Sequence, residues 1–233
     1  MLLDWQKTNE LLKKYQIPLV ESLVIENIQQ GIEFANKVGF PVVLKLLSQD
    51  NLHKVDKGLV KLNIQNKQDL TSNFAILSQQ DQNDGGYTGC VIIQKQVVGT
   101  ELFLGMKRDK SFGCVISFGL GGIFVEVLED IGFGICPINK EYALEIIKSI
   151  KGYKVLTNYR GRTPVNLEKL ADIVMNISKL AVENENIQEI DFNPVMANGS
   201  EILIVDPKVI MGHLNYEMSR VCHSEQQRRI STH

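Results

Sequence analysis

The sequence predicts an α+β protein built as two lobes around a cleft, and three observations lead to this fold class. An apolar strand candidate, an amphipathic helix and a second apolar strand open the chain as a βαβ-like unit. Several strand candidates then follow one another, with two long helix candidates after them. The last part reads as an antiparallel hairpin, and 233 residues are enough for two small cores.

The first half alternates helices and strands. Leucines at helical spacing predict a helix over 3–15 that ends before Pro18, and 17–23 is predicted as a short strand. The pattern at 27–38 predicts an amphipathic helix, with Gly39 as its C-cap. The remaining elements are strands at 41–48 and 58–64, a polar helix at 66–79 and a turn-rich break at 81–86.

The second half is richer in strands. Its elements are strands at 90–97, 101–109 and 114–120, a glycine-rich segment at 119–127, and helices at 140–151 and 166–184. A hairpin of IQEIDFNPVMAN and GSEILIVDPKVI turns at Asn198–Gly199. We expect an N-terminal lobe at 1–95, a C-terminal lobe at 96–212 and a loose tail at 213–233.

Composition excludes several classes of partner. Hydrophobic residues make up 44% of the chain, charged residues 22%, and the formal net charge is −2. This balance gives no electrostatic case for binding nucleic acid or an anionic membrane. No window approaches about 20 apolar residues, so no membrane span is expected.

Cysteine usage and the N-terminus indicate a cytoplasmic protein. Four cysteines, at positions 90, 114, 136 and 222, form no CxxC pair. Three of them lie in apolar, strand-like surroundings and are predicted to be buried, reduced thiols. The first residues lack the basic start and continuous apolar run of a signal peptide.

Lys45 stands in the middle of the apolar run VVLKLL. Burying an ammonium there is costly unless it meets an anion, and a lysine at the end of a long stem suits phosphate. The alternative is a lysine on an edge strand whose ammonium reaches solvent.

His53 lies in the polar loop SQDNLHKVDKG, where no apolar face is present to hold the ring. An imidazole nitrogen is a competent nucleophile toward phosphorus near neutral pH. The alternative is an exposed or structural histidine.

Glycines and oxygen ligands mark two further places. Gly119, Gly121 and Gly122 could bring backbone N–H groups close to an anion, or could simply make a tight connection between strands. Asn193 and Asp206 lie at nearly equal distances from the hairpin turn and could project to one face beside Asp191. Such oxygens suit Mg²⁺, although capping within the hairpin would also use them.

Three arginines complete the cationic set. Arg108 ends a strand, and Arg160 and Arg162 flank a glycine in a loop between two helices. They could clamp phosphate oxygens, or they could be ordinary solvated charges.

From about residue 5 to residue 212 the chain resembles the ATP-grasp subunit of ADP-forming acetate (acyl)-CoA ligases, which is related to the succinyl-CoA synthetase β chain. The resemblance is carried, in this order, by GFPVVLKLLS, LHKVDKGLVKLN, GTELFLGMKRD, FGLGGIFVEVLED, YRGRTPVN, EIDFNPV and VDPK. It implies an ATP-grasp fold with the nucleotide between the lobes.

The resemblance also implies a role for each matching position. The implied nucleotide-binding residues are Lys45, Gln94, Lys95, Val97, Glu101, Arg108, Gly121 and Gly122, with Arg160 and Arg162 as a phosphate clamp, Asn193 and Asp206 as the Mg²⁺ pair, and His53 as the phosphate carrier. Among these, Gln94–Val97 would touch adenine, Glu101 would bind the ribose, and Lys45 and Arg108 would reach the phosphates. The loop departs from the usual HKSD, because it reads HKVD here.

The implied activity is that of an acid–thiol ligase subunit that moves phosphate between a phosphohistidine and ADP or ATP. It would require a separate α-type subunit, which binds CoA and makes the acyl-phosphate, since no CoA-binding domain is recognised in this sequence. Two alternatives remain open: a regulatory or degenerate subunit that binds nucleotide without turnover, and a succinyl-CoA-synthetase-like β subunit. Neither the acyl group nor the preference for ATP over GTP is fixed by the sequence.

Overall fold

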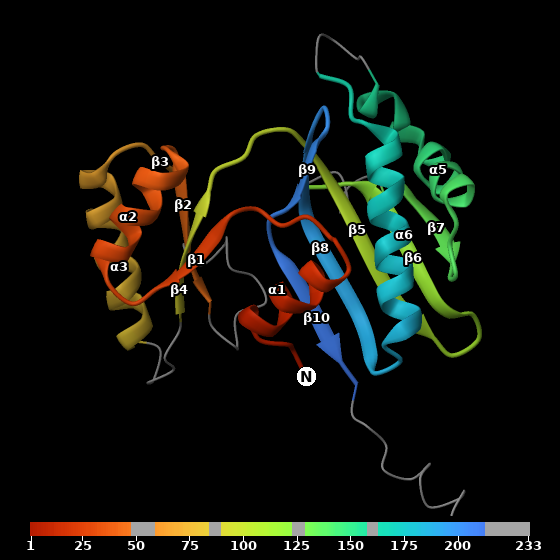
Figure 1. The fold of residues 1–233 in the computed structure, drawn as a ribbon, viewed down its shortest axis with the longest axis horizontal. Helices are drawn as coiled ribbons and strands as arrows, with labels where there is room; N and C mark the ends of the chain where they lie inside the picture. The colour runs from red at the N-terminus through yellow and green to blue at the C-terminus, as the bar shows by residue number, and fades with distance from the viewer. Residues whose placement is uncertain (48–58, 84–89, 123–128, 158–162, 213–233) are drawn as a thin grey trace, which may run out of the picture.

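The computed structural model of the chain describes residues 1–47, 59–83, 90–122, 129–157 and 163–212. Within these ranges the chain forms two antiparallel sheets, each with its own apolar core and its own helices (Figure 1). None of the helices in these ranges is both long enough and apolar enough to span a membrane.

The smaller sheet has the strand order β1-β4-β2-β3. Its elements are β1 (Ser22–Ile25), α2 (Ile28–Val38), β2 (Val42–Leu47), β3 (Val60–Ile64), α3 (Lys67–Asn83) and β4 (Cys90–Lys95). Alternate residues of β2, including Val42, Leu44 and Leu46, enter the core under α2 and α3. Because successive strand residues point to opposite faces, Val43 and Lys45 point away from that core.

The larger sheet has the order β10-β8-β5-β6-β7, with β9 paired to β8. Its elements are β5 (Thr100–Asp109), β6 (Gly113–Leu120), β7 (Ile131–Ile135), α5 (Lys140–Ser149), the 3₁₀ helix η1 (Lys151–Leu156), α6 (Leu167–Glu183), β8 (Ile187–Asn198), β9 (Glu201–Ile204) and β10 (Pro207–Met211). Helices α5 and α6 cover one face of this sheet (Figure 1). The fold is therefore the mixed helix-and-sheet, two-lobed arrangement that the sequence predicted.

The first 20 residues pack with the larger sheet before the chain enters the smaller one. Helix α1 (Trp5–Lys14) contacts β10, and Leu12 and Ile17 belong to the larger core. The backbone N–H of Ile204 donates to Pro18 at 2.9 Å, which ties this segment to β9. The predicted lobe boundary at 95 falls in the connection between β4 and β5, although α1 contributes to the other core.

Local signals placed several helix ends correctly. Asn27 caps α2, since its side chain accepts from the backbone N–H of Gln30, and Gly39 ends the helix with φ at +84°. Helix α1 begins at Asp4, whose side chain accepts from the N–H of Lys7. Those hydrogen bonds at the N-termini satisfy donors that have no partner within the helix.

Several elements differ from the prediction. Helix α3 continues to Asn83, into the turn-rich break predicted at 81–86, and the 3₁₀ helix η1 was not predicted. The strand expected at 17–23 is shifted, because residues 17–20 run beside β9 and only Ser22–Ile25 pair in the smaller sheet. Strand β7 was not predicted, because glycines break its apolar pattern. They are needed where α5 crosses, since a Cβ at Gly134 would lie 2.2 Å from the Cδ1 of Ile146.

The cysteines are free thiols in the described part of the chain, as expected, but their burial varies. Cys114 is buried and Cys136 is half-buried, whereas Cys90 is exposed at the start of β4. The prediction of a buried Cys90 was therefore wrong. Cys222 lies outside the described residues.

Candidate functional site

Lys45 lies at the face where the two sheets meet. Its side chain is only 6% exposed, and its Nζ donates to the carbonyl of Val205, in the β9–β10 connection, at 3.2 Å. Strand β2 lies between β4 and β3, so Lys45 is not on an edge strand and does not extend to solvent. The alternative of a solvent-seeking edge lysine is thereby excluded.

Gln94 approaches the same carbonyl from the neighbouring strand. It lies opposite Val43 in the ladder, is 1% exposed, and donates from Nε2 to the Val205 carbonyl at 3.1 Å. Its Oε1 is buried and has no hydrogen-bond partner among the described residues. Such an acceptor costs about 1–3 kcal/mol when left unsatisfied, and none of the described residues supplies the donor that would satisfy it.

Asn193 and Asp206 lie directly opposite each other. Strand β8 keeps one register before and after this pair, since Phe192 lies opposite Pro207 and Val195 lies opposite Ile204. Both residues are half-buried. Since Asp206 follows Val205, the oxygen pair lies next to the carbonyl that Lys45 and Gln94 share.

The third member of the predicted acidic cluster has a different function. Asp191 is opposite Lys208, and its Oδ2 lies 3.4 Å from the Lys208 Nζ. Both side chains are partly buried. This ion pair occupies the carboxylate of Asp191 and stabilises the pairing of β8 with β10.

Glu101 lies beside the glycine segment. The N–H of Gly121 donates to the backbone carbonyl of Glu101 at 2.8 Å, and a Cβ at Gly122 would lie 2.2 Å from the Oε2 of Glu101. Gly122 also has φ at +63°, a region that glycine adopts without strain. A side chain at position 122 would therefore displace the carboxylate predicted to bind ribose.

The predicted hinge connects the two sheets. Lys95 is exposed and Val97 is half-buried, and the backbone N–H of Lys95 donates to Glu21 at 3.0 Å. The side chain of Gln96 is held by Asn63, from which its Oε1 accepts at 2.7 Å. The hinge is thus anchored to the smaller sheet as far as residue 96.

Arg108 lies at the opposite end of β5 from Glu101. Its guanidinium donates to the backbone carbonyls of Ile187 at 2.7 Å and Asn184 at 3.0 Å, and also to that of Ala181. These carbonyls lie at the C-terminal end of α6, which carries partial negative charge. In this structure the Arg108 donors therefore cap a helix at the end of β5 opposite Glu101, and its contact with nucleotide phosphates stays a prediction.

The remaining predicted positions, His53, Arg160 and Arg162, lie outside the described residues. A residue that sequence reasoning missed is Val205, whose backbone carbonyl joins the two sheets. A main-chain oxygen leaves no residue-type signal, so only the position just before Asp206 could have indicated it.

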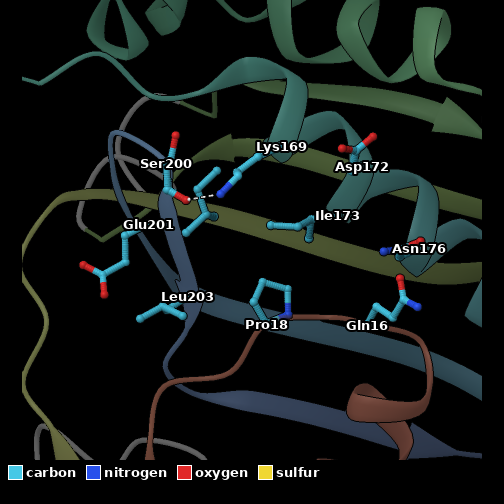
Figure 2. Close-up of a pocket in the computed structure, with 10 residues that line it drawn as sticks. Gln16, Pro18, Lys169, Asp172, Ile173, Asn176, Ser200, Glu201 and Leu203 are labelled. Carbon is cyan, nitrogen blue, oxygen red and sulfur yellow. Dashed lines mark hydrogen bonds between the residues drawn. The ribbon is translucent and has the colours of Figure 1, made fainter. Parts of the chain in front are cut away.

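A separate groove lies on the outer side of the larger sheet, with a volume of about 550 Å³. Figure 2 shows it between α6 and β9, with Lys169 donating to the backbone carbonyl of Ser200 at 3.3 Å. None of the residues predicted to bind nucleotide lines this groove. The candidate site is therefore the place where Lys45, Gln94, Val205, Asn193 and Asp206 meet.

Comparison with known proteins gives a consistent result over nearly the whole described chain. The model of the ATP-grasp domain family matches residues 1–211. The β subunit of acetate–CoA ligase (ADP-forming) I from Pyrococcus furiosus is 41% identical over 208 residues, which are 88% of this chain and 90% of that subunit. Acetate–CoA ligase (ADP-forming) I from Archaeoglobus fulgidus is 37% identical over 204 residues, which are 87% of this chain and 30% of that longer protein.

A solved structure is similar in fold as well as in sequence. Acetyl-coenzyme A synthetase 1 from Ca. Korarchaeum cryptofilum superposes with a TM-score of 0.78 at 33% identity, covering 90% of this chain and 92% of the other. That structure contains coenzyme A and Mg-AMPPCP, with its phosphohistidine segment pointing towards the nucleotide-binding site.

Proposed function

Because the chain belongs to the ATP-grasp family of ADP-forming acetate–CoA ligase β subunits, we propose that it is the nucleotide-binding subunit of such a ligase, acting in the cytoplasm. It transfers a phosphoryl group between a histidine and ADP or ATP. The observation that carries the proposal is the shared Val205 carbonyl. It brings Lys45 and Gln94 of one sheet to the segment of the other that holds Asp206.

The described residues fit a nucleotide with its phosphates near Lys45. The buried, unpartnered Oε1 of Gln94 can accept a hydrogen bond from a donor on the nucleotide. The carboxylate of Glu101, backed by Gly122, suits a ribose hydroxyl. The ammonium of Lys45 supplies positive charge at a place that is nearly closed to water.

Asn193 and Asp206 fit Mg²⁺ as a pair of hard oxygen donors. Within the described ranges no cluster of three or more His, Cys, Asp or Glu side chains could hold a metal alone. Mg²⁺ commonly takes one or two protein ligands and completes its shell with phosphate oxygens and water. When bound, the ion neutralises charge on the phosphate oxygens during transfer.

His53 is proposed as the phosphate carrier on the basis of the sequence. When ATP is consumed, an imidazole nitrogen of His53 attacks the γ-phosphorus, a P–N bond forms, and the bond to the ADP oxygen breaks with its electron pair leaving on ADP. When ATP is made, an oxygen of the ADP β-phosphate attacks the phosphohistidine and the electron pair returns to the ring. Both directions require in-line geometry and nearby cations.

A CoA-binding α-type subunit is the proposed partner. It would exchange phosphate with His53 and carry the acyl-CoA chemistry. The Archaeoglobus relative is a longer chain in which the part matched by this sequence covers only 30%. The Pyrococcus furiosus relative, of which the match covers 90%, is by contrast a β subunit, and this supports a separate α-type partner.

Labelling with radioactive ATP tests the proposal. The complex with its α partner should acquire an acid-labile, base-stable phosphoryl group that is lost in His53→Ala and kept in the matched control His213→Ala. Added ADP should remove the label and regenerate ATP. If the wild-type complex binds ATP but no phosphohistidine forms, the alternative of a regulatory nucleotide-binding subunit would replace this proposal.

A further inference from the structure

A row of three chemically active side chains crosses the larger sheet away from the nucleotide residues. Arg108 of β5 lies opposite Cys114 of β6. Cys114 in turn lies opposite Cys136, since the register of β6 and β7 continues from Val115 and Ile135, and the N–H of Cys136 donates to the carbonyl of Cys114 at 2.9 Å. The Cys114 Sγ–H donates to the Cys136 Sγ at 3.0 Å.

The backbone at this pair suits a covalent bond between the two sulfurs. Directly opposite residues in a hydrogen-bonded antiparallel pair have Cα atoms about 5.5 Å apart. That separation falls inside the range of roughly 4.4–6.8 Å found for disulfides. No displacement of strand β7 along β6 is required.

The two thiols differ in access and in charge. Cys114 is only 7% exposed, whereas Cys136 is half-buried and can be reached from solvent. The pKa of Cys136 is lowered to about 7, chiefly by the hydrogen bond from Cys114 and also by Ser178 and Arg108, while burial acts in the opposite direction. The same hydrogen bond, together with burial, raises the pKa of Cys114. Cys136 is therefore the thiol that ionises and reacts first.

We propose that Cys114 and Cys136 form a reversible disulfide, with a low-molecular-weight disulfide as the oxidant. The Cys136 thiolate attacks one sulfur of the oxidant and expels the first small thiolate. The Cys114 sulfur then attacks the mixed disulfide at Cys136 and expels the second. The two protons lost by the cysteines end on the two small thiols, so two protein thiols are oxidised and one small disulfide is reduced.

The disulfide would link β7, at the edge of the larger sheet, covalently to β6. Strand β7 pairs only with β6 in the sheet order and otherwise rests on α5 (Figure 1). The cross-link would close the chain between residues 114 and 136, a loop of a size for which disulfides raise the melting temperature by roughly 5–10 °C. In a reducing compartment the thiols stay free until the thiol–disulfide balance changes.

The test uses the full-length chain with Cys90→Ser and Cys222→Ser, so that only the proposed pair remains. The protein is equilibrated in glutathione buffers of increasing oxidation, free thiols are alkylated, and peptides are mapped by mass spectrometry. We expect a linked Cys114–Cys136 peptide and a higher melting temperature in the oxidised protein, and neither change in a matched variant that also carries Cys136→Ser.

If a serine variant does not fold, peptide mapping of the oxidised wild-type chain still shows whether the Cys114–Cys136 peptide is linked. Two outcomes would overturn the proposal: both thiols remaining alkylatable in the most oxidising buffer, or Cys136 carrying glutathione while Cys114 stays free. A linked peptide without any rise in melting temperature would overturn the stabilising effect of this link on β7.

Discussion

Replacing Gln94 with leucine should weaken nucleotide binding without weakening the fold. The change removes the hydrogen bond from Nε2 to Val205, which is worth about 0.5–1.5 kcal/mol. It also removes the buried, unpartnered Oε1, whose cost is about 1–3 kcal/mol. Lys45 still donates to the Val205 carbonyl, so this acceptor keeps a hydrogen-bond donor.

The two terms together predict a change in unfolding free energy between about −0.5 and +2.5 kcal/mol. For a chain of this size, the melting temperature should move by roughly −2 to +8 °C. Nucleotide affinity should fall, because the proposed acceptor is lost. One hydrogen bond worth about 1–2 kcal/mol corresponds to a Kd higher by roughly 5–30-fold.

Isothermal titration calorimetry with ADP and Mg²⁺ measures the affinity, and scanning calorimetry measures the stability. Gln29→Leu is the control, because Gln29 is an exposed glutamine on α2, outside the predicted hinge, whose side chain donates to Glu33. The reasoning is refuted if Gln94→Leu melts far below the wild type while its Kd for ADP stays within twofold. Such a result would make Gln94 a purely structural residue.

Four other predictions follow from the same geometry. Lys45→Met should raise the Kd for ADP at least tenfold, because the buried cation proposed to meet the phosphates is removed. Unchanged binding in calorimetry would contradict this. Asp206→Asn should raise the Mg²⁺ concentration needed for half-maximal ADP binding, measured by titration, since one oxygen donor loses its charge. Arg108→Ala should lower the unfolding free energy by about 2–4 kcal/mol in denaturant titrations, because its donors cap α6, and it should leave ADP affinity unchanged. Weaker ADP binding without destabilisation would instead support the predicted phosphate contact. The rate of Cys136 alkylation should increase as the pH rises through about 7 and level off above it, because the thiolate is the nucleophile and the pKa of Cys136 is lowered to about 7. A stopped-flow rate that keeps rising beyond pH 9 would argue against this assignment.

Much of the candidate site could be found from residue order. A lysine inside an apolar strand is costly wherever it lies, so Lys45 stood out before any fold was known. The turn predicted at Asn198–Gly199 was one residue too early, since Asn198 pairs with Glu201 and the turn is Gly199–Ser200. The hairpin itself was predicted, and its observed register places Asn193 opposite Asp206. Local capping chemistry likewise gave the limits of α2.

Other features depended on contacts between residues far apart in the chain. Arg108 looked like a phosphate ligand in sequence, but the fold brings three backbone carbonyls to its guanidinium, from the end of α6, its C-cap and the start of β8. The unpredicted strand β7 is held by its pairing to β6, in spite of glycines that lower its strand propensity. Its register is also what brings Cys136 to Cys114.

The sequence by itself determined which residue types carry chemistry and which short segments are helical or extended, since propensity, capping and turn signals act over a few residues. Only the tertiary structure decided that the backbone carbonyl of Val205 joins Lys45 and Gln94 of the smaller sheet to the larger sheet. The physical reason is that main-chain oxygens are alike at every position, and burial and distance alone select the one that is used.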